Sequence, residues 1–317
     1  MEPKKLMQKD TVFQVMSMTK PVTAAAVMIC AERGLLNLDD PVSRYLPAFA
    51  DLRVKQPDGT VKPANRTITI RHLLTHTSGL SSNDPGGLDD ATKARLTLSD
   101  YASRYGQDPL EFEPGTQIRY SGPGITAAGR IVEIVNKMKF ETFLKVELFD
   151  KLKMKDTTFF ASESYKSRLA QMTWFEEGAW RVINADPMRP GSKFANPAGG
   201  LYSTATDMAR FMQCIVSGGE GILSRRSVTA MTTLQTGSLL SDGNDIQGYG
   251  LGFSVIRHPA GGPTLRPPGS FGHTGAFNTE MWADPKTKTV VVYMSQTWND
   301  RPRKTFTTMV NAAFVGP

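Results

Sequence analysis

A helix that is apolar on nearly every side, placed directly after a short strand, constrains the fold of this chain more than any other feature. Residues 17–33 have a helical pattern with almost no polar face, and Gly34 follows as a C-terminal stop. Thr11–Met16 (TVFQVM) before it is predicted to be a strand. A helix of this composition is predicted to be buried, with Ser17 at the strand–helix junction.

The rest of the pattern is helical in the middle of the chain and strand-like toward its end. Residues 51–66 are predicted to form a loop or a small hairpin. Further helices are predicted at Thr69–Thr75, Ser99–Tyr105, Pro123–Asn136, Phe140–Phe149, Ala205–Val216, Ser224–Leu234 and Lys304–Phe314. Strands with period-two patterning are predicted at Tyr249–Ile256, Thr279–Ala283 and Thr289–Ser295.

This order predicts an α+β fold, in which an antiparallel sheet lobe flanked by helices carries an inserted helical lobe. We expect one domain over residues 1–317. Its sheet lobe is expected at about 1–66 and 185–317, and its helical lobe at about 67–184.

Composition agrees with a globular protein and argues against two kinds of partner. Of 317 residues, 40% are hydrophobic and 21% are charged, which allows a sizeable core. The net charge is +7, but the basic residues are scattered and do not form the dense stripe that binds nucleic acid. The longest apolar stretch, Pro21–Ala31, is too short to span a bilayer. We therefore expect no nucleic-acid partner and no membrane span.

The sequence also gives expectations for location, cysteines and metals. No apolar signal core follows Met1, so the cytoplasm is the default location, and a periplasmic or secreted location would need a missing upstream segment. Cys30 and Cys214 lie in apolar helical surroundings and are expected to be buried free thiols. His72 and His76 have a helix-compatible metal spacing, but no glutamate lies between them. We expect neither a metal nor an organic cofactor.

Ser17 and Lys20 form an S-x-x-K pattern at the start of the apolar helix. Positions i and i+3 share a helix face, so the hydroxyl and the amine can meet. Serine is a weak nucleophile without an adjacent base, and lysine can be that base when burial lowers its pKa. The alternative is an N-cap serine with a lysine whose amine extends to the surface. A lysine that opens an otherwise apolar helix fits this alternative poorly.

Several segments, in order along the chain, resemble one enzyme superfamily. Ser17–Pro21 (SMTKP) and Ile70–Leu80 (IRHLLTHTSGL) resemble the first characteristic blocks of the serine β-lactamases, DD-peptidases and related esterases. The resemblance is to the class C-like branch, which includes the family VIII carboxylesterases. It continues through Pro114-Gly115, Tyr120-Ser121-Gly122, Gly199–Ala205 and Gly272–Gly275, and so covers essentially the whole chain.

The resemblance implies roles for individual residues. Ser17 would be the nucleophile and Lys20 its activating partner. Tyr120 matches the tyrosine of a Tyr-x-Asn motif and would relay protons, although a half-buried structural aromatic is the alternative. The backbone N–H groups of Ser17 and Ala276 would form an oxyanion hole.

His273-Thr274-Gly275 falls on the family's Lys-Thr-Gly motif, which the resemblance places on an edge-facing strand. Some DD-peptidase-like and aminopeptidase-like members also have histidine there. Thr274 would contact polar groups of the substrate, with Gly122, His273 and Gly275 beside it. The alternative for His273 is a strand histidine bonded to solvent.

Three departures from the family pattern modify this expectation. Gly122 replaces the asparagine that holds a substrate amide, and His273 replaces the lysine that steers a substrate carboxylate. Both favour carboxylesterase-like hydrolysis of small esters over turnover of β-lactams or D-amino-acid peptides. Family members usually have a helix and two strands before the position of Thr11, so we expect an exposed sheet edge, in a trimmed chain or one covered by a second subunit in a homo-oligomer.

Two other functions are alternatives to an S-x-x-K hydrolase. A non-catalytic binding protein derived from the same family stays open, because the short N-terminus could leave the site malformed. A Ser-His-Asp hydrolase of the α/β type is excluded, since no G-x-S-x-G elbow occurs in the sequence.

Overall fold

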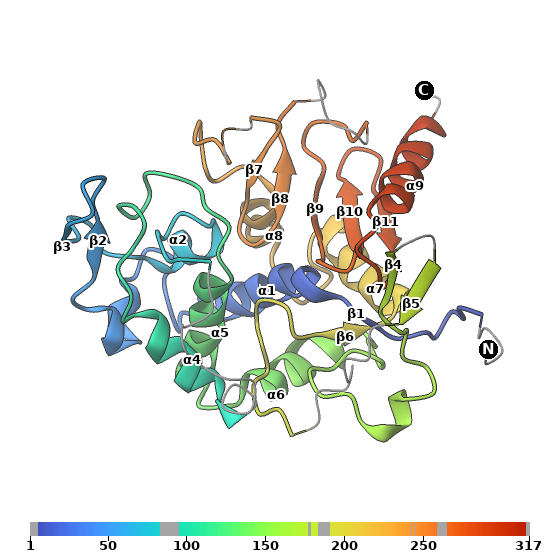
Figure 1. Cartoon of the computed structure of the whole chain (residues 1–317), viewed down its shortest axis with the longest axis horizontal. Helices are drawn as coiled ribbons and strands as arrows, with labels where there is room; N and C mark the ends of the chain where they lie inside the picture. The colour runs from blue at the N-terminus through green and yellow to red at the C-terminus, as the bar shows by residue number, and fades with distance from the viewer. Residues whose placement is uncertain are drawn as a thin grey trace.

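The structure is a computed structural model that describes residues 6–82, 95–176, 179–182, 191–241, 243, 245–258 and 265–314. Its centre is the predicted apolar helix. Strand β1 (Phe13–Gln14) leads into one 3-10 turn, Met16–Met18, and then into α1 (Thr19–Glu32). Every residue of α1 from Thr19 to Cys30 is buried, as predicted for a helix without a polar face. Figure 1 shows α1 between the large sheet and the helices of the middle of the chain.

The large sheet is antiparallel and has five strands in the order β11-β10-β9-β8-β7. Its strands are β7 (Gln247–Tyr249), β8 (Ser254–Ile256), β9 (Phe271–Thr274), β10 (Glu280–Asp284) and β11 (Thr289–Tyr293). The predicted hairpin of the last two strands is confirmed. Helix α7 (Ala205–Val216) packs against β10 and β11, and α8 (Arg225–Thr232) packs against α1. Helix α9 (Arg301–Ala312) contacts β10 through a hydrogen bond from the Thr307 hydroxyl to Glu280.

Two predictions about this sheet are wrong. Tyr249–Ile256 is not one strand, because residues 250–253 turn the chain back between β7 and β8. Gly252 in that turn has φ +77°, and a Cβ there would lie 2.4 Å from the Cβ of Ala24 on α1. A glycine therefore lets the turn approach the central helix. The additional hairpin covers one side of β9, so His273 lies on the middle strand and not on an edge-facing one.

The predicted helices of the middle region are present and surround the other side of α1. They are α2 (Ile70–Leu74), α4 (Leu98–Tyr105), α5 (Gly122–Asn136) and α6 (Phe140–Leu144), which continues as a π-type turn through Phe149. Thr69 caps α2 as predicted, with its side chain accepting the N–H of His72. Helix α5 packs against α1, α2, α4 and α6, so it connects the buried helix to the helical region.

Small sheets and short turns complete the structure. Strand β1 pairs with β6 (Tyr202–Ser203), and the predicted hairpin in residues 51–66 consists of β2 (Arg53–Lys55) and β3 (Val61–Pro63). A further hairpin pairs β4 (Thr173–Glu176) with β5 (Ala179–Val182). Short 3-10 turns lie at Val42–Arg44, Pro47–Phe49 and Glu163–Tyr165.

The α+β class is confirmed, whereas the division into two lobes stays a prediction. The large sheet takes no strand from the described residues 6–66, although these supply the central helix. Both cysteines are buried and free, as predicted. None of the helices in the described segments is long and apolar enough to cross a bilayer.

Candidate active site

Ser17 lies in the tight turn that joins β1 to α1. Met16 before it has φ +51°, a left-handed conformation that costs energy for a non-glycine residue and often occurs at functional sites. Two hydrogen bonds hold this turn: the Val15 N–H donates to the Leu201 carbonyl at 3.0 Å, and the Thr19 hydroxyl donates to the Met16 carbonyl at 2.6 Å. The Ser17 side chain is thereby presented from a fixed backbone.

Lys20 lies one helical turn after Ser17, and its amine is buried beside the Ser17 hydroxyl. The Nζ atom lies 3.0 Å from Ser17 Oγ and donates to the Ala198 carbonyl at 2.6 Å. The residue is only 2% exposed, and burial lowers the pKa of its amine to about 7. A substantial fraction of the Lys20 amines is therefore neutral near pH 7, and the neutral amine can accept a proton.

Tyr120 directly precedes Ser121, the N-cap residue of α5. The Nζ atom of Lys20 lies 4.6 Å from the centroid of the Tyr120 ring. Burial raises the pKa of the Tyr120 phenol above its usual value, and a hydrogen bond with Ser17 opposes this rise. The phenol thus stays protonated and is in contact with the Ser17 hydroxyl, where it can pass a proton on.

His273 on β9 is buried, which contradicts the alternative of a solvent-bonded surface histidine. It is 6% exposed, and its Nδ1 lies 2.7 Å from the Thr274 carbonyl, so Nδ1 carries the ring proton. Its Nε2 has no hydrogen-bond partner in the part of the chain that the structure describes. Burial and the charge of Lys20 lower the pKa of His273 to about 3. His273 is therefore neutral and cannot replace the charge of a lysine.

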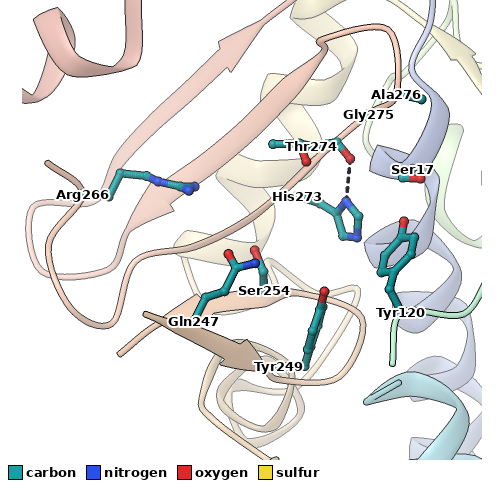
Figure 2. A pocket seen from close by; sticks show the side chains of 10 residues that line it. All are labelled: Ser17, Tyr120, Gln247, Tyr249, Ser254, Arg266, His273, Thr274, Gly275 and Ala276. Atoms are coloured by element: carbon teal, nitrogen blue, oxygen red, sulfur yellow. Dashed lines mark hydrogen bonds between the residues drawn. The ribbon is translucent and has the colours of Figure 1, made fainter. Parts of the chain in front are cut away.

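Gly275 lets the end of β9 approach the Ser17 turn. A Cβ on Gly275 would lie 2.1 Å from Thr279 Oγ1 and 2.4 Å from the Val15 carbonyl oxygen, so a side chain would clash. This approach brings Ala276 beside Ser17, as Figure 2 shows. Among the described residues, none accepts a hydrogen bond from the backbone N–H of Ser17 or Ala276. Both amides are therefore available to an oxyanion.

These residues border a cavity of about 350 Å³. It is lined by Ser17, Tyr120, Gln247, Tyr249, Ser254, Arg266, His273, Thr274, Gly275 and Ala276 (Figure 2). Of the predicted site residues, Lys20 lies behind Ser17, and Gly122 at the start of α5 does not line the cavity.

Sequence reasoning missed four of the lining residues: Gln247, Tyr249, Ser254 and Arg266. Ser254 Oγ donates to the Gly272 carbonyl at 3.0 Å and is oriented by the sheet. These side chains follow no motif. Gln247, Tyr249 and Ser254 reach the cavity because the β7–β8 hairpin lies beside β9, and Arg266 reaches it from the residues before β9.

Arg266 gives one wall of the cavity a positive charge. Its guanidinium lies 3.7 Å from the carboxylate of Glu280, which is 1% exposed. Glu280 is also bonded by Arg303 at 3.2 Å and by the Thr307 hydroxyl at 2.6 Å. In the described part of the chain, two guanidinium groups therefore face one carboxylate, and these three groups together carry a net positive charge.

The described segments contain no group of three or more side chains that could hold a metal ion. In both histidines with metal-like spacing, the Nδ1 atom accepts a hydrogen bond from a backbone N–H group. His72 Nδ1 accepts from the Thr69 N–H at 3.2 Å, and His76 Nδ1 accepts from the Ser121 N–H at 3.1 Å.

Comparisons with known proteins agree with the fold and the motifs. A family model described as Beta-lactamase matches residues 1–314. An uncharacterized protein of Mycobacterium tuberculosis is 32% identical over 92% of this chain and 78% of that protein. Esterase EstB of Burkholderia gladioli is 29% identical over 88% of this chain and 75% of the esterase. Simvastatin synthase (LovD) from Aspergillus terreus shares the fold, with a TM-score of 0.83 at 24% identity, over 100% of this chain and 88% of that structure.

Proposed function

This chain belongs to the β-lactamase family and is a serine hydrolase, and we propose that it hydrolyses small carboxylic esters through an acyl-enzyme on Ser17. The observation that carries the proposal is the buried Lys20 amine, 3.0 Å from Ser17 Oγ, with its pKa lowered to about 7. Membership in a family of hydrolases also argues against the non-catalytic binding protein considered from the sequence.

Acylation begins when neutral Lys20 accepts the Ser17 proton as Oγ attacks the ester carbonyl carbon. The negative charge that develops on the carbonyl oxygen is stabilised by the N–H groups of Ser17 and Ala276. The proton then passes through the Tyr120 hydroxyl to the departing alkoxide, which leaves as the alcohol. Water attacks the acyl-enzyme along the reverse proton path and releases the acid, so Ser17 and Lys20 return to their starting states.

Two features support an ester as the substrate. Neutral His273 removes the positive charge that a lysine would have beside Thr274. An aromatic cluster also begins next to Ala276: Phe277 lies 6.3 Å from Trp298 between ring centroids, and Trp298 lies 4.8 Å from Trp174. Trp298 is 49% exposed, and Phe277 connects it to the segment that lines the cavity at Ala276, so this exposed aromatic surface suits an apolar acyl or alcohol group that extends out of the cavity. The esterase name of one relative agrees with this choice.

A second candidate is hydrolysis of an amide that carries a carboxylate, as in a β-lactam or a D-amino-acid peptide. The observation that favours it is Arg266, which lines the same cavity as Thr274 (Figure 2). A carboxylate bound to Arg266 would form a charge-assisted hydrogen bond in a partly dehydrated site.

A substrate panel separates the two candidates. We expect kcat/KM for p-nitrophenyl butyrate to exceed that for a chromogenic cephalosporin and for a D-Ala-D-Ala peptide by about 100-fold or more, because neutral His273 supplies no cation beside Thr274 to hold the carboxylate of an anionic amide. Steady-state kinetics with the three substrates at one pH and ionic strength make the comparison. A higher kcat/KM for the cephalosporin or the peptide would replace the ester with the second candidate.

The aromatic cluster predicts a dependence on chain length. Replacing Trp298 with alanine is expected to lower kcat/KM for p-nitrophenyl octanoate by about 10-fold, since roughly 50 Å² of apolar contact is worth a little over 1 kcal/mol. Activity on p-nitrophenyl acetate should change little. Met309→Ala is the matched control, because Met309 is 66% exposed on α9. Equal losses on both esters would contradict a contact with the apolar part of the substrate.

A further inference from the structure

We propose that His76 is a positioning residue that holds the Tyr120 phenol against Ser17. The inference rests on the proposed acyl-enzyme mechanism and adds a residue to it. His76 lies in the turn after α2, far from Ser17 in sequence, and it does not line the cavity. It acts through Tyr120 and does not touch the substrate.

Two hydrogen bonds from His76 fix the backbone on both sides of Tyr120. The Arg119 N–H donates to the His76 carbonyl oxygen at 2.8 Å. The Ser121 N–H donates to the His76 Nδ1 atom at 3.1 Å. The residue before Tyr120 and the residue after it are therefore both bound to His76. This arrangement restricts rotation of the peptide groups that carry the Tyr120 side chain.

The imidazole ring also packs directly on the phenol ring. The centroids of His76 and Tyr120 are 4.7 Å apart, with the ring planes tilted by 39°. On another side, His76 contacts the Tyr249 ring at 4.7 Å in an edge-to-face arrangement. His76 has no exposed surface, so its ring is held by its neighbours. Backbone and ring contacts together place Tyr120 between His76 and the Lys20–Ser17 pair.

A residue that served only to fill this space would not need an imidazole. Because Nδ1 accepts a hydrogen bond, the neutral ring carries its proton on Nε2. That Nε2 is buried without a hydrogen-bond partner among the described residues, which disfavours the folded state. A leucine would avoid this penalty but could not accept the Ser121 N–H. The acceptor at Nδ1 is what distinguishes histidine here. Burial and the charge of Lys20 hold the pKa of His76 well below its usual value, so the acceptor stays unprotonated.

Two substitutions of His76 distinguish the effect of its hydrogen-bond acceptor from the effect of its left-handed backbone turn. His76 has φ +58°, which glycine and asparagine tolerate better than other residues. The His76→Asn variant places Oδ1 where Nδ1 lies and keeps an acceptor for Ser121. The His76→Gly variant keeps the turn and removes the acceptor. The carbonyl contact to Arg119 is backbone and is present in both variants.

Steady-state kinetics on p-nitrophenyl butyrate provide the test. We expect His76→Gly to lower kcat by about 100-fold with KM changed less than about threefold, because a displacement of a reacting group by about 1 Å costs that much. The His76→Asn variant should keep kcat within about 10-fold of the parent. A folded His76→Asn variant that loses as much as His76→Gly would overturn the proposal, and so would a His76→Gly variant with unchanged kcat. If His76→Gly does not fold, a His76→Asn loss of about 100-fold or more overturns it alone.

A double-mutant cycle with Tyr120→Phe distinguishes positioning from general destabilisation. If His76 acts through the phenol, His76→Gly should lower kcat by less than about threefold in the Tyr120→Phe background. A full, additive loss in that background would show a role unrelated to Tyr120. The Ser17→Ala variant distinguishes failure of this inference from failure of the proposed function. If the proposed function is wrong, Ser17→Ala keeps its activity. If only the role of His76 is wrong, Ser17→Ala still loses its activity.

Discussion

Replacing Ser17 with alanine is expected to lower kcat/KM for p-nitrophenyl butyrate by about 10⁴-fold or more, because no covalent intermediate can form without Oγ. Of Ser17 and Ser254, the serines among the described residues that line the cavity, Ser17 has its hydroxyl 3.0 Å from the buried Lys20 amine. Residual hydrolysis would come from the oxyanion hole and from substrate binding alone. The melting temperature should change little, since Ser17 is only partly buried.

The cavity itself offers a matched control for this substitution. Ser254 also lines the cavity, but its hydroxyl donates to the Gly272 carbonyl and is not next to a base. The Ser254→Ala variant is expected to keep kcat/KM within about 10-fold of the parent enzyme. A Ser17→Ala variant no slower than Ser254→Ala would rule out Ser17 as the nucleophile.

Replacing Lys20 with methionine is expected to abolish most activity while making the protein more stable. Loss of the base should lower kcat/KM by about 10³-fold or more. The free energy of unfolding at pH 7 should rise by about 1–2 kcal/mol, because an apolar side chain of similar length removes a buried amine, although the Ala198 carbonyl loses its donor. Equilibrium urea unfolding measures this gain, with Lys286→Met as an exposed control.

The sign of the pH dependence follows from the Lys20 pKa. The pKa of Lys20 is about 7 in the folded chain, whereas its ordinary value, which applies to the unfolded chain, is 10.5. Between pH 7 and pH 10.5 the Lys20 amine is therefore mostly protonated in the unfolded chain and mostly neutral in the folded chain. The free energy of unfolding contributed by Lys20 therefore rises with pH across this window. The stability advantage of Lys20→Met should be largest at pH 7 and shrink toward pH 10. An advantage independent of pH would contradict the assigned pKa.

The same pKa sets the activity profile of the parent enzyme. Since only neutral Lys20 accepts the Ser17 proton, kcat/KM should rise with pH and reach half its maximum near pH 7. Buried His273 and His76 both have lowered pKa values and contribute no titration in that range.

The contact between Ser17 and Lys20 could be predicted from the sequence because the two residues are close together along the chain. Ser17 and Lys20 are one helical turn apart, so their contact follows from the helix alone. The buried helix follows from the lack of a polar face. Tyr120 and His273 are different, because they are far apart in sequence and enter the proposed site only through the order of motifs along the chain. The catalytic role of Tyr120 and the substrate-binding role of His273 stay predictions.

Other parts of the site have no sequence signal that reasoning could use. The partner of Lys20 is the carbonyl oxygen of Ala198, a group that every residue has. Arg266 reaches the cavity from the residues before β9, and its ion-pair partner Glu280 lies on β10. The β7–β8 hairpin was predicted as a single strand, since period-two patterning in YGLGFSVI continues through the turn residues. Here the close approach of Gly252 to α1, a tertiary contact, decides the structure.

The most direct test of the central claim is mass spectrometry of the covalent intermediate. The enzyme is mixed with excess p-nitrophenyl butyrate, quenched in acid within the first turnovers, digested and analysed by tandem mass spectrometry. We expect the mass of one butyryl group on the peptide that contains Ser17, located on Ser17 itself, and no such adduct in the Ser17→Ala variant. A butyryl group on another residue, with Ser17 unmodified in an enzyme that turns over the ester, would contradict the account.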